Sequence, residues 1–137
     1  MTKSFFAAAA FAALATPSFA DMARYDLDPS HTAVYFTVTH IGYSRTLGIF
    51  TDLEGGFSYD LDNRELGPVA VSIDAASVNT FNNARDKHVK NRDFLHVSQH
   101  PEITFVANGG TAKGADRGTV TGDLTIEVYN NAGTAEV

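Results

Sequence analysis

The chain contains 137 residues and no cysteine, so disulfide bonds cannot hold it, and a folded domain must depend on its core and its backbone hydrogen bonds. Its length is typical of a single small domain. Sixteen acidic residues outnumber ten basic ones, and this negative balance argues against nucleic acid or an anionic lipid surface as the main partner.

The first residues, MTKSFFAAAAFAALATPSFADM, are typical of a secretory signal peptide. Lys3 precedes an apolar run, and small residues lead up to Ala20, after which cleavage is expected. The run is shorter than the roughly 20 residues of a membrane-spanning helix, so no stable membrane insertion is expected after cleavage. We therefore predict a signal peptide at residues 1–20 and a mature domain at residues 21–137.

Most of the mature chain alternates apolar and polar residues, which predicts β-strands buried on one face. In the stretch HTAVYFTVTH, the apolar residues Val34, Phe36 and Val38 share one parity with His40. Such strands must close into a barrel or pack as two sheets, and a barrel that holds one small ligand takes about eight strands. Five strands are expected here, over residues 32–40, 47–59, 69–78, 102–107 and 118–128.

The alternation disappears between residues 79 and 101, where charged residues cluster. We expect a loop that carries a short helix from about Ala84 to Phe94. Asn82 or Asn83 can cap the start of this helix, and Pro101 ends the loop.

Two histidines frame the first predicted strand. His31 and His40 have opposite parity, so in a regular strand they point to opposite faces and do not form one site. We expect His31 to make a structural hydrogen bond at the strand entry. His40 shares the apolar face, where it either orients a ligand at the mouth of an apolar cavity or is simply satisfied at the sheet edge.

The remaining histidines lie in or near the charged loop. His96 and His100 have the i, i+4 spacing of some helical zinc sites, but Pro101 disfavours a helical conformation at His100. Together with His88 they offer a three-histidine metal cluster, although neither cysteine nor an HExxH motif supports it. Loop histidines that bind nothing are the alternative.

The segment ARDKHVKNRD gathers basic residues that suit an anion, and Arg85 and His88 are best spaced to face one target. Asp86 and Asp93 interleave with them, so a self-neutralising, solvated helix is the alternative. The sequence has no nucleophile elbow and no phosphate-binding glycine loop, so no catalysis is expected.

Several motifs in combination resemble the YceI-like family of bacterial polyisoprenoid-binding proteins. The resemblance covers nearly the whole mature chain, from about Tyr25 to Ile126. The motifs are the DPSH entry, the strand that ends in His40, the Gly48-Ile49-Phe50 step, the DAAS run, RDKH followed by Asp93-Phe94, the PEITF strand and Gly122-Asp123-Leu124.

This resemblance implies a periplasmic protein that folds as an all-β, antiparallel, lipocalin-like β-barrel. The barrel would enclose an apolar tunnel for an isoprenoid chain, such as that of a quinone or a prenyl alcohol. Neither enzyme activity nor a metal or cofactor is implied. The candidate tunnel or core residues are Phe36, Val38, Phe50, Phe57, Val71, Ile73 and Phe105. The candidates for the polar mouth are His40, Arg85, Asp86 and His88.

The family pattern continues after TGDLTI with strands that close the barrel, whereas this chain reads EVYNNAGTAEV. We therefore expect an incomplete barrel whose last strand has an open edge, which allows pairing with a second copy of the chain. Two other functions stay open. One is a metal-binding protein or enzyme that uses His88, His96 and His100, and the other is a stress-response scaffold that contacts a protein partner through the free edge.

Overall fold

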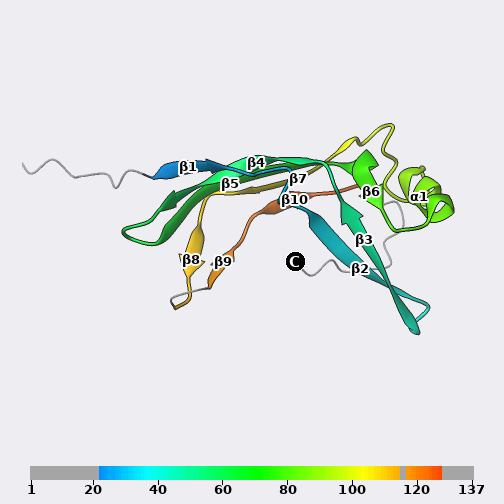
Figure 1. Ribbon diagram of the computed structural model, residues 1–137, viewed down its shortest axis with the longest axis horizontal. Helices are drawn as coiled ribbons and strands as arrows, with labels where there is room; N and C mark the ends of the chain where they lie inside the picture. Colours follow the sequence, from blue (N-terminus) through cyan, green and yellow to red (C-terminus); the bar gives the residue numbers. More distant parts are fainter. Residues whose placement is uncertain (1–21, 115–116, 128–137) are drawn as a thin grey trace, which may run out of the picture.

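The computed structural model describes residues 22–114 and 117–127 (Figure 1). The predicted signal peptide at residues 1–20 lies outside this part, as do the last residues of the predicted domain. The α-helix is α1 (Asn83–Lys90), and a short 3-10 helix covers Ala75–Ser77. The strands are β1 (Ala23–Asp26), β2 (Val34–His40), β3 (Ser44–Phe50), β4 (Leu53–Asp60), β5 (Glu65–Asp74), β6 (Val78–Asn79), β7 (Glu102–Ala107), β8 (Gly110–Ala112), β9 (Gly118–Val120) and β10 (Asp123–Thr125).

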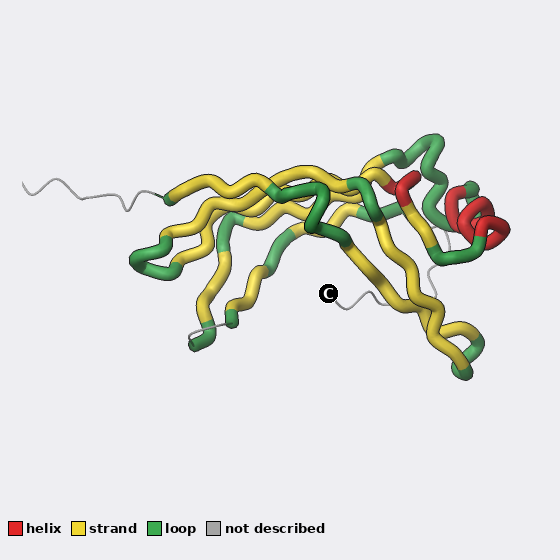
Figure 2. Tube along the Cα trace, in the orientation of Figure 1, coloured by secondary structure: helices red, strands yellow, loops and turns green. Residues whose placement is uncertain are grey.

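These strands form two antiparallel sheets, which confirms the all-β class. The larger sheet has the order β1-β4-β5-β7-β10, with β8 paired to β5 and β9 paired to β8. The smaller sheet has the order β2-β3-β6. Figures 1 and 2 show that the β2–β3 and β8–β9 hairpins both extend from one side of the larger sheet, like the two sides of an arch. Among the described residues, the two sheets do not join into a closed barrel.

The expectation of five strands was wrong, because three predicted strands are each divided in two and because β1 and β8 were not predicted. Residues 69–78 divide into β5 in the larger sheet and β6 in the smaller one. Residues 47–59 were expected as one strand, but β3 ends at Phe50 in the smaller sheet and β4 begins at Leu53 in the larger one. Residues 118–128 divide at Gly122 into β9 and β10. The buried parity changes at the first corner, from Gly48 and Phe50 in β3 to Leu53 in β4, whereas regular alternation over residues 47–59 predicts one buried parity throughout.

The core lies where three strands of the larger sheet bring apolar residues into one row. Leu53 pairs with Ile73, and Ile73 pairs with Ile103, and each is at most 6% exposed. Full burial of such a side chain contributes about 1.5–3 kcal/mol. Further core residues cover this row from the smaller sheet and from the loop around α1, namely Phe50, Ala75, Val78 and Leu95.

The helix begins as predicted and ends earlier than predicted. The Asn82 side chain caps it by accepting a hydrogen bond from the backbone N–H of Arg85 at 3.0 Å. The predicted end at Phe94 is wrong, since α1 stops at Lys90. The chain folds back there because Leu95 enters the core, and the Leu95 N–H donates to the carbonyl oxygen of Val89.

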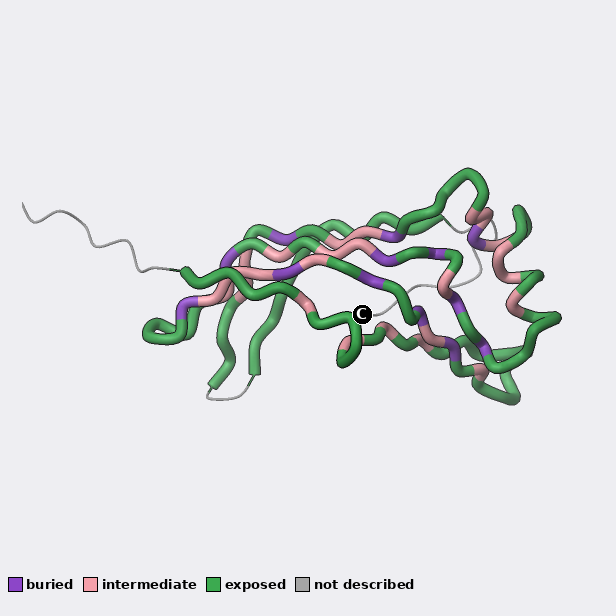
Figure 3. The backbone as a smooth tube through the Cα atoms, turned by 45° about the horizontal axis from the view of Figure 1, so that its top comes forward, coloured by how far each residue is buried: buried purple, intermediate pink, exposed green. Residues whose placement is uncertain are grey.

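Burial is uneven along the molecule. Figure 3 shows buried residues along the central strands of the larger sheet and in the segment around α1. In strands β8 and β9, by contrast, every residue except the half-buried Gly110 is exposed. The tightly packed part of the protein is therefore the end that carries α1.

Gly48→Ala tests the packing of the smaller sheet against this core. A Cβ atom at Gly48 would lie 2.3 Å from the Cζ atom of Phe36, whose ring stacks at a tilt against Phe50. We expect the substitution to lower the free energy of unfolding by about 1–3 kcal/mol, measured by urea denaturation. Adding Phe36→Leu should restore part of the loss, and strictly additive losses in this double-mutant cycle would contradict the proposed contact.

Candidate functional site

The apolar row of the core continues along the same face of the larger sheet, toward the end that α1 does not cover. Val71 and Phe105 are direct cross-strand partners, and Leu124 pairs with Phe105 on the next strand. Because alternate residues share a face, Val71 and Phe105 lie on the side of Ile73 and Ile103. Val71 and Phe105 are only half buried, and Leu124 is 40% exposed. We call this surface the inner face.

Two aromatic rings extend the inner face toward β1. Phe57 pairs with Val69 on β5 and with Tyr25 on β1. The rings of Tyr25 and Phe57 are stacked, with centroids 5.4 Å apart and planes 14° from parallel. Their flat surfaces add a rigid apolar area of the kind that packs against hydrocarbon.

The opposite face of the same strands is mainly polar. It carries Glu54, Ser72 and Thr104, and Arg24 forms an exposed ion pair with Asp26 at 3.0 Å. A hollow of about 550 Å³ lies over this outer face. The larger sheet is therefore amphipathic: its aromatic and large aliphatic side chains gather on the inner face, whereas the outer face mixes polar residues with Ala70 and Val106.

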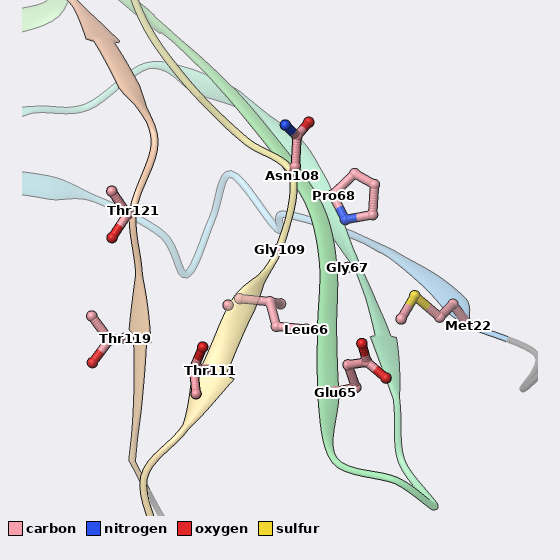
Figure 4. Close-up of a pocket in the computed structure, with 11 residues that line it drawn as sticks. Met22, Glu65, Leu66, Gly67, Pro68, Asn108, Gly109, Thr111, Thr119 and Thr121 are labelled. Atoms are coloured by element: carbon pink, nitrogen blue, oxygen red, sulfur yellow. The ribbon is translucent and has the colours of Figure 1, made fainter.

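A second hollow, of about 440 Å³, lies between β5, β8 and β9 (Figure 4). Its lining includes Thr111, Thr119 and Thr121 together with Glu65 and Asn108. None of the predicted site residues lines it. Its polar character does not suit an apolar ligand.

The structure divides the predicted apolar residues into two groups and two single residues. Phe50 and Ile73 belong to the closed core, where they are each 6% exposed. Phe57, Val71 and Phe105 lie together on the inner face, as described above. Phe36 packs against the core from β2. The last residue, Val38, is 54% exposed on the β2–β3 hairpin. The inner-face group is thus the part of the predicted set that is half-exposed and continuous with the core along one face.

Arg85 and Asp86, predicted at a polar mouth, are held by one buried residue, Thr80. The Thr80 hydroxyl donates to Asp86 Oδ1 at 2.6 Å, and the Thr80 backbone N–H donates to the same oxygen at 2.7 Å. Arg85 Nε donates to the Thr80 hydroxyl, and Arg85 Nη2 donates to the Thr80 carbonyl oxygen. This cluster ties the first turn of α1 to the end of β6.

The Thr80 cluster also explains the acidity of Asp86. The hydrogen bond from the Thr80 hydroxyl, followed by that from its backbone N–H, holds the pKa of Asp86 below its ordinary value. Lys90 and Arg85 lower this pKa further, and burial offsets part of the effect. Ionised Asp86 therefore stabilises the fold at neutral pH.

The histidines lie apart from the inner face. His88 packs its ring edge-on against Phe94, with centroids 4.9 Å apart, and its Nε2 is 3.6 Å from a carboxylate oxygen of Asp93. The rings of His96 and His100 are 5.8 Å apart. Within the described ranges, no group of three histidine, aspartate or glutamate side chains is placed to hold a metal ion. His40 is exposed at the end of β2, opposite Ser44.

The predicted structural hydrogen bond of His31 is confirmed. His31 Nδ1 lies 2.7 Å from Asp28 Oδ2 and 2.9 Å from the Ser30 hydroxyl, which itself donates to Asp28 Oδ1. These hydrogen bonds lower the pKa of Asp28, and the bond from the Ser30 side chain has the largest effect. The cluster shapes the entry into β2 and does not arrange a serine nucleophile, because the hydroxyl is directed at the carboxylate.

Sequence reasoning missed several residues of the inner face and the whole Thr80 cluster. Tyr25 was missed because β1 is a short strand, although the alternation in Arg24-Tyr25-Asp26-Leu27 was a usable signal. Leu124 had the correct parity but was not selected. Thr80 gave no sequence signal, because a threonine in a polar loop is ordinarily exposed.

A mostly antiparallel fold with an apolar inner face agrees with what comparison with known proteins finds. A sequence profile described as the YceI-like domain matches residues 25–136. The chain belongs to the YceI-like family. A UPF0312 protein of Ectopseudomonas mendocina is 41% identical over 101 residues, which are 74% of this chain and 53% of that protein. The UPF0312 protein Shewana3_1179 of Shewanella sp. is 36% identical over 128 residues, 92% of this chain and 67% of its own length.

Solved structures show the same fold. A Campylobacter jejuni YceI protein is similar with a TM-score of 0.59 and 35% identity, over 74% of this chain and 60% of its own. Burkholderia cenocepacia BcnA has a TM-score of 0.64 at 24% identity, over 72% of this chain and 62% of its own, a likeness that concerns the fold alone. This YceI-like chain spans about half the length of the first curated relatives that it matches.

One further observation concerns membranes. Over residues 22–114 and 117–127, no helix combines the length and the apolar character needed to cross a bilayer.

Thr80→Val tests the Thr80 cluster. Loss of the hydroxyl removes one hydrogen bond from Asp86 and one from Arg85, so we expect the free energy of unfolding at pH 7 to fall by about 1–2 kcal/mol. Because the folded pKa of Asp86 is lowered, its stabilising effect is complete above the ordinary value of 3.8 and is lost as pH falls through the folded pKa. The difference between Thr80→Val and the unsubstituted protein should therefore narrow in acid.

Denaturant curves between pH 2 and pH 7 measure this effect, with the pH range set by the carboxyl titration. Thr119→Val, at an exposed position of β9, is the matched control and should change the free energy little at any pH. A loss at Thr80 that is equal at every pH would contradict the coupling to Asp86.

Proposed function

We propose that this YceI-like protein binds an amphiphile by covering its isoprenoid chain with the inner face of the larger sheet. The observation that carries the proposal is the run of half-exposed apolar side chains continuous with the core. Its members come from five adjacent strands, β1, β4, β5, β7 and β10, and face one way. Family membership and the sequence resemblance to polyisoprenoid-binding proteins support the same reading.

The energetics favour a long apolar ligand over a small polar one. Each methylene group removed from water contributes about 0.8 kcal/mol, so an isoprenoid chain needs few polar contacts to bind well. Aromatic rings such as the Tyr25–Phe57 pair offer flat surfaces to a branched, unsaturated chain. Binding would also remove from water an apolar surface that is otherwise unfavourable to expose.

Few of the predicted residues are placed to contact the polar headgroup of the ligand. His40 is exposed and lies outside the Thr80 cluster, so among the predicted mouth residues it is the one that we propose for a headgroup extending beyond the inner face. Arg85 and Asp86 already bind Thr80, and their first role is structural. We also propose that the protein acts in the periplasm as a carrier or store, after export by the predicted signal peptide, and that it performs no catalysis.

Leu124→Asn and Val106→Asn form a matched pair that tests the proposal. Leu124 is 40% exposed on the inner face, whereas Val106 is 50% exposed on the outer face of the neighbouring strand. Both substitutions should have similar, small effects on stability. We expect Leu124→Asn to weaken binding of a fluorescent prenyl compound about tenfold, and Val106→Asn to leave it unchanged.

The measurement is a titration of the purified protein, preceded by lipid extraction and mass spectrometry after expression with the signal peptide. A co-purified isoprenoid lost only in Leu124→Asn is the expected result. A folded protein that neither carries nor takes up prenyl compounds would refute the proposal. Equal losses in both variants would show that the apolar chain does not lie on the inner face.

A further inference from the structure

The β2–β3 hairpin ends in a group of apolar side chains that project into solvent. Its tip, which we define as residues 40–45 and call the β2–β3 tip, points away from the larger sheet (Figures 1 and 2). Ile41 is 75% exposed and Tyr43 is 94% exposed. These two side chains belong neither to the core nor to the inner face.

The backbone of this tip is strained, because a β-branched residue occupies a turn position with positive φ. The Tyr43 N–H donates to the His40 carbonyl oxygen at 3.1 Å, and the two residues between them, Ile41 and Gly42, have φ of 50° and 76°. Such turns favour Asn, Asp or Gly at both positions, and a β-branched residue with positive φ is an outlier. An isoleucine here keeps an exposed apolar group at a cost in stability, which is typical of functional positions.

Charge is also distributed unevenly around the β2–β3 tip. Although the whole chain has a net charge of −6, no aspartate or glutamate occurs from residue 29 to residue 51. Arg45 is the last residue of the tip and is exposed, with its Nη2 donating to the Thr37 hydroxyl at 3.1 Å. Because the rest of the molecule is acidic and the β2–β3 tip carries a cation without acidic neighbours in sequence, a negatively charged surface attracts the protein through the tip.

From these three observations we propose that the β2–β3 tip is a docking element for the surface of a lipid bilayer. Ile41 enters the boundary between headgroups and acyl chains, and the amphipathic Tyr43 ring lies at headgroup level. Arg45 contacts lipid phosphate. The contact is peripheral and reversible, because the inserted apolar area is small.

The inference goes beyond the proposed function, because docking requires no ligand on the inner face. It supplies what an isoprenoid carrier needs, since an amphiphile with a long apolar chain resides in a bilayer before it is captured. Docking through the tip also changes what the net negative charge of the chain implies about binding to an anionic lipid surface. The acidic residues keep the rest of the molecule off an anionic surface and leave one end free to approach it.

A tryptophan reporter tests docking directly, because the chain contains no tryptophan. In Tyr43→Trp, the indole is the only one present and replaces an almost fully exposed ring. Vesicles of about three parts phosphatidylethanolamine to one part phosphatidylglycerol should shift its emission to shorter wavelength, and brominated lipids should quench it. Leu61→Trp is the control, since Leu61 is 70% exposed in the β4–β5 turn at the far end of the molecule (Figure 1) and should show neither effect.

Ile41→Asn separates docking from folding. Asparagine tolerates positive φ, so the Tm should stay the same or rise, while vesicle partitioning measured by flotation should fall about tenfold. Leu61→Asn should leave partitioning unchanged. The proposal is overturned if Ile41→Asn partitions like the unsubstituted protein, or if the emission shift of Tyr43→Trp appears without vesicles as protein concentration rises, which would assign the tip to contact with a second copy.

Discussion

The antiparallel register of β5 with β4 and β7 is the constraint on which the rest of this structure depends. It brings Leu53, Ile73 and Ile103 into one row, and burial of these side chains supplies much of the free energy that holds the larger sheet together. Because side chains alternate along a strand, the same register carries Val71 and Phe105 onto the same side. Core and candidate binding surface are thus two parts of one apolar face.

The core and the candidate binding surface differ in whether other parts of the chain cover them. The loop around α1 closes the face at one end, and it is fastened there by hydrogen bonds from Thr80 and Arg85 and by the carboxylate of Asp86. A hydrogen bond to a charged group contributes more to stability than one between neutral groups. Removal of one partner of a buried bond is costly, because the other partner then lacks both solvent and a hydrogen bond. Arg85 and Asp86 of α1 therefore serve first to hold the loop around α1 over the core.

An exposed apolar surface has a free-energy cost in water, and the protein carries such surface in two places. The inner face presents it along the strands, where a long chain can lie, and the β2–β3 tip presents it at a point, where only a short insertion fits. The strained φ of Ile41 adds to the cost at the tip. Both surfaces become favourable in contact with lipid, which gives a single physical setting for binding and docking.

The sequence by itself determined the all-β class and the capped helix, because alternation and capping depend on residues close in the chain. The resemblance to the YceI-like family indicated Phe57, Val71 and Phe105 as candidate tunnel or core residues. Only the tertiary structure decided that residues 47–59 form two strands in different sheets, with the buried parity changing between Phe50 and Leu53, because the partners that a strand pairs with lie far away in the chain. It alone placed Arg85 and Asp86 on Thr80, because partners that a fold brings together leave no pattern in sequence.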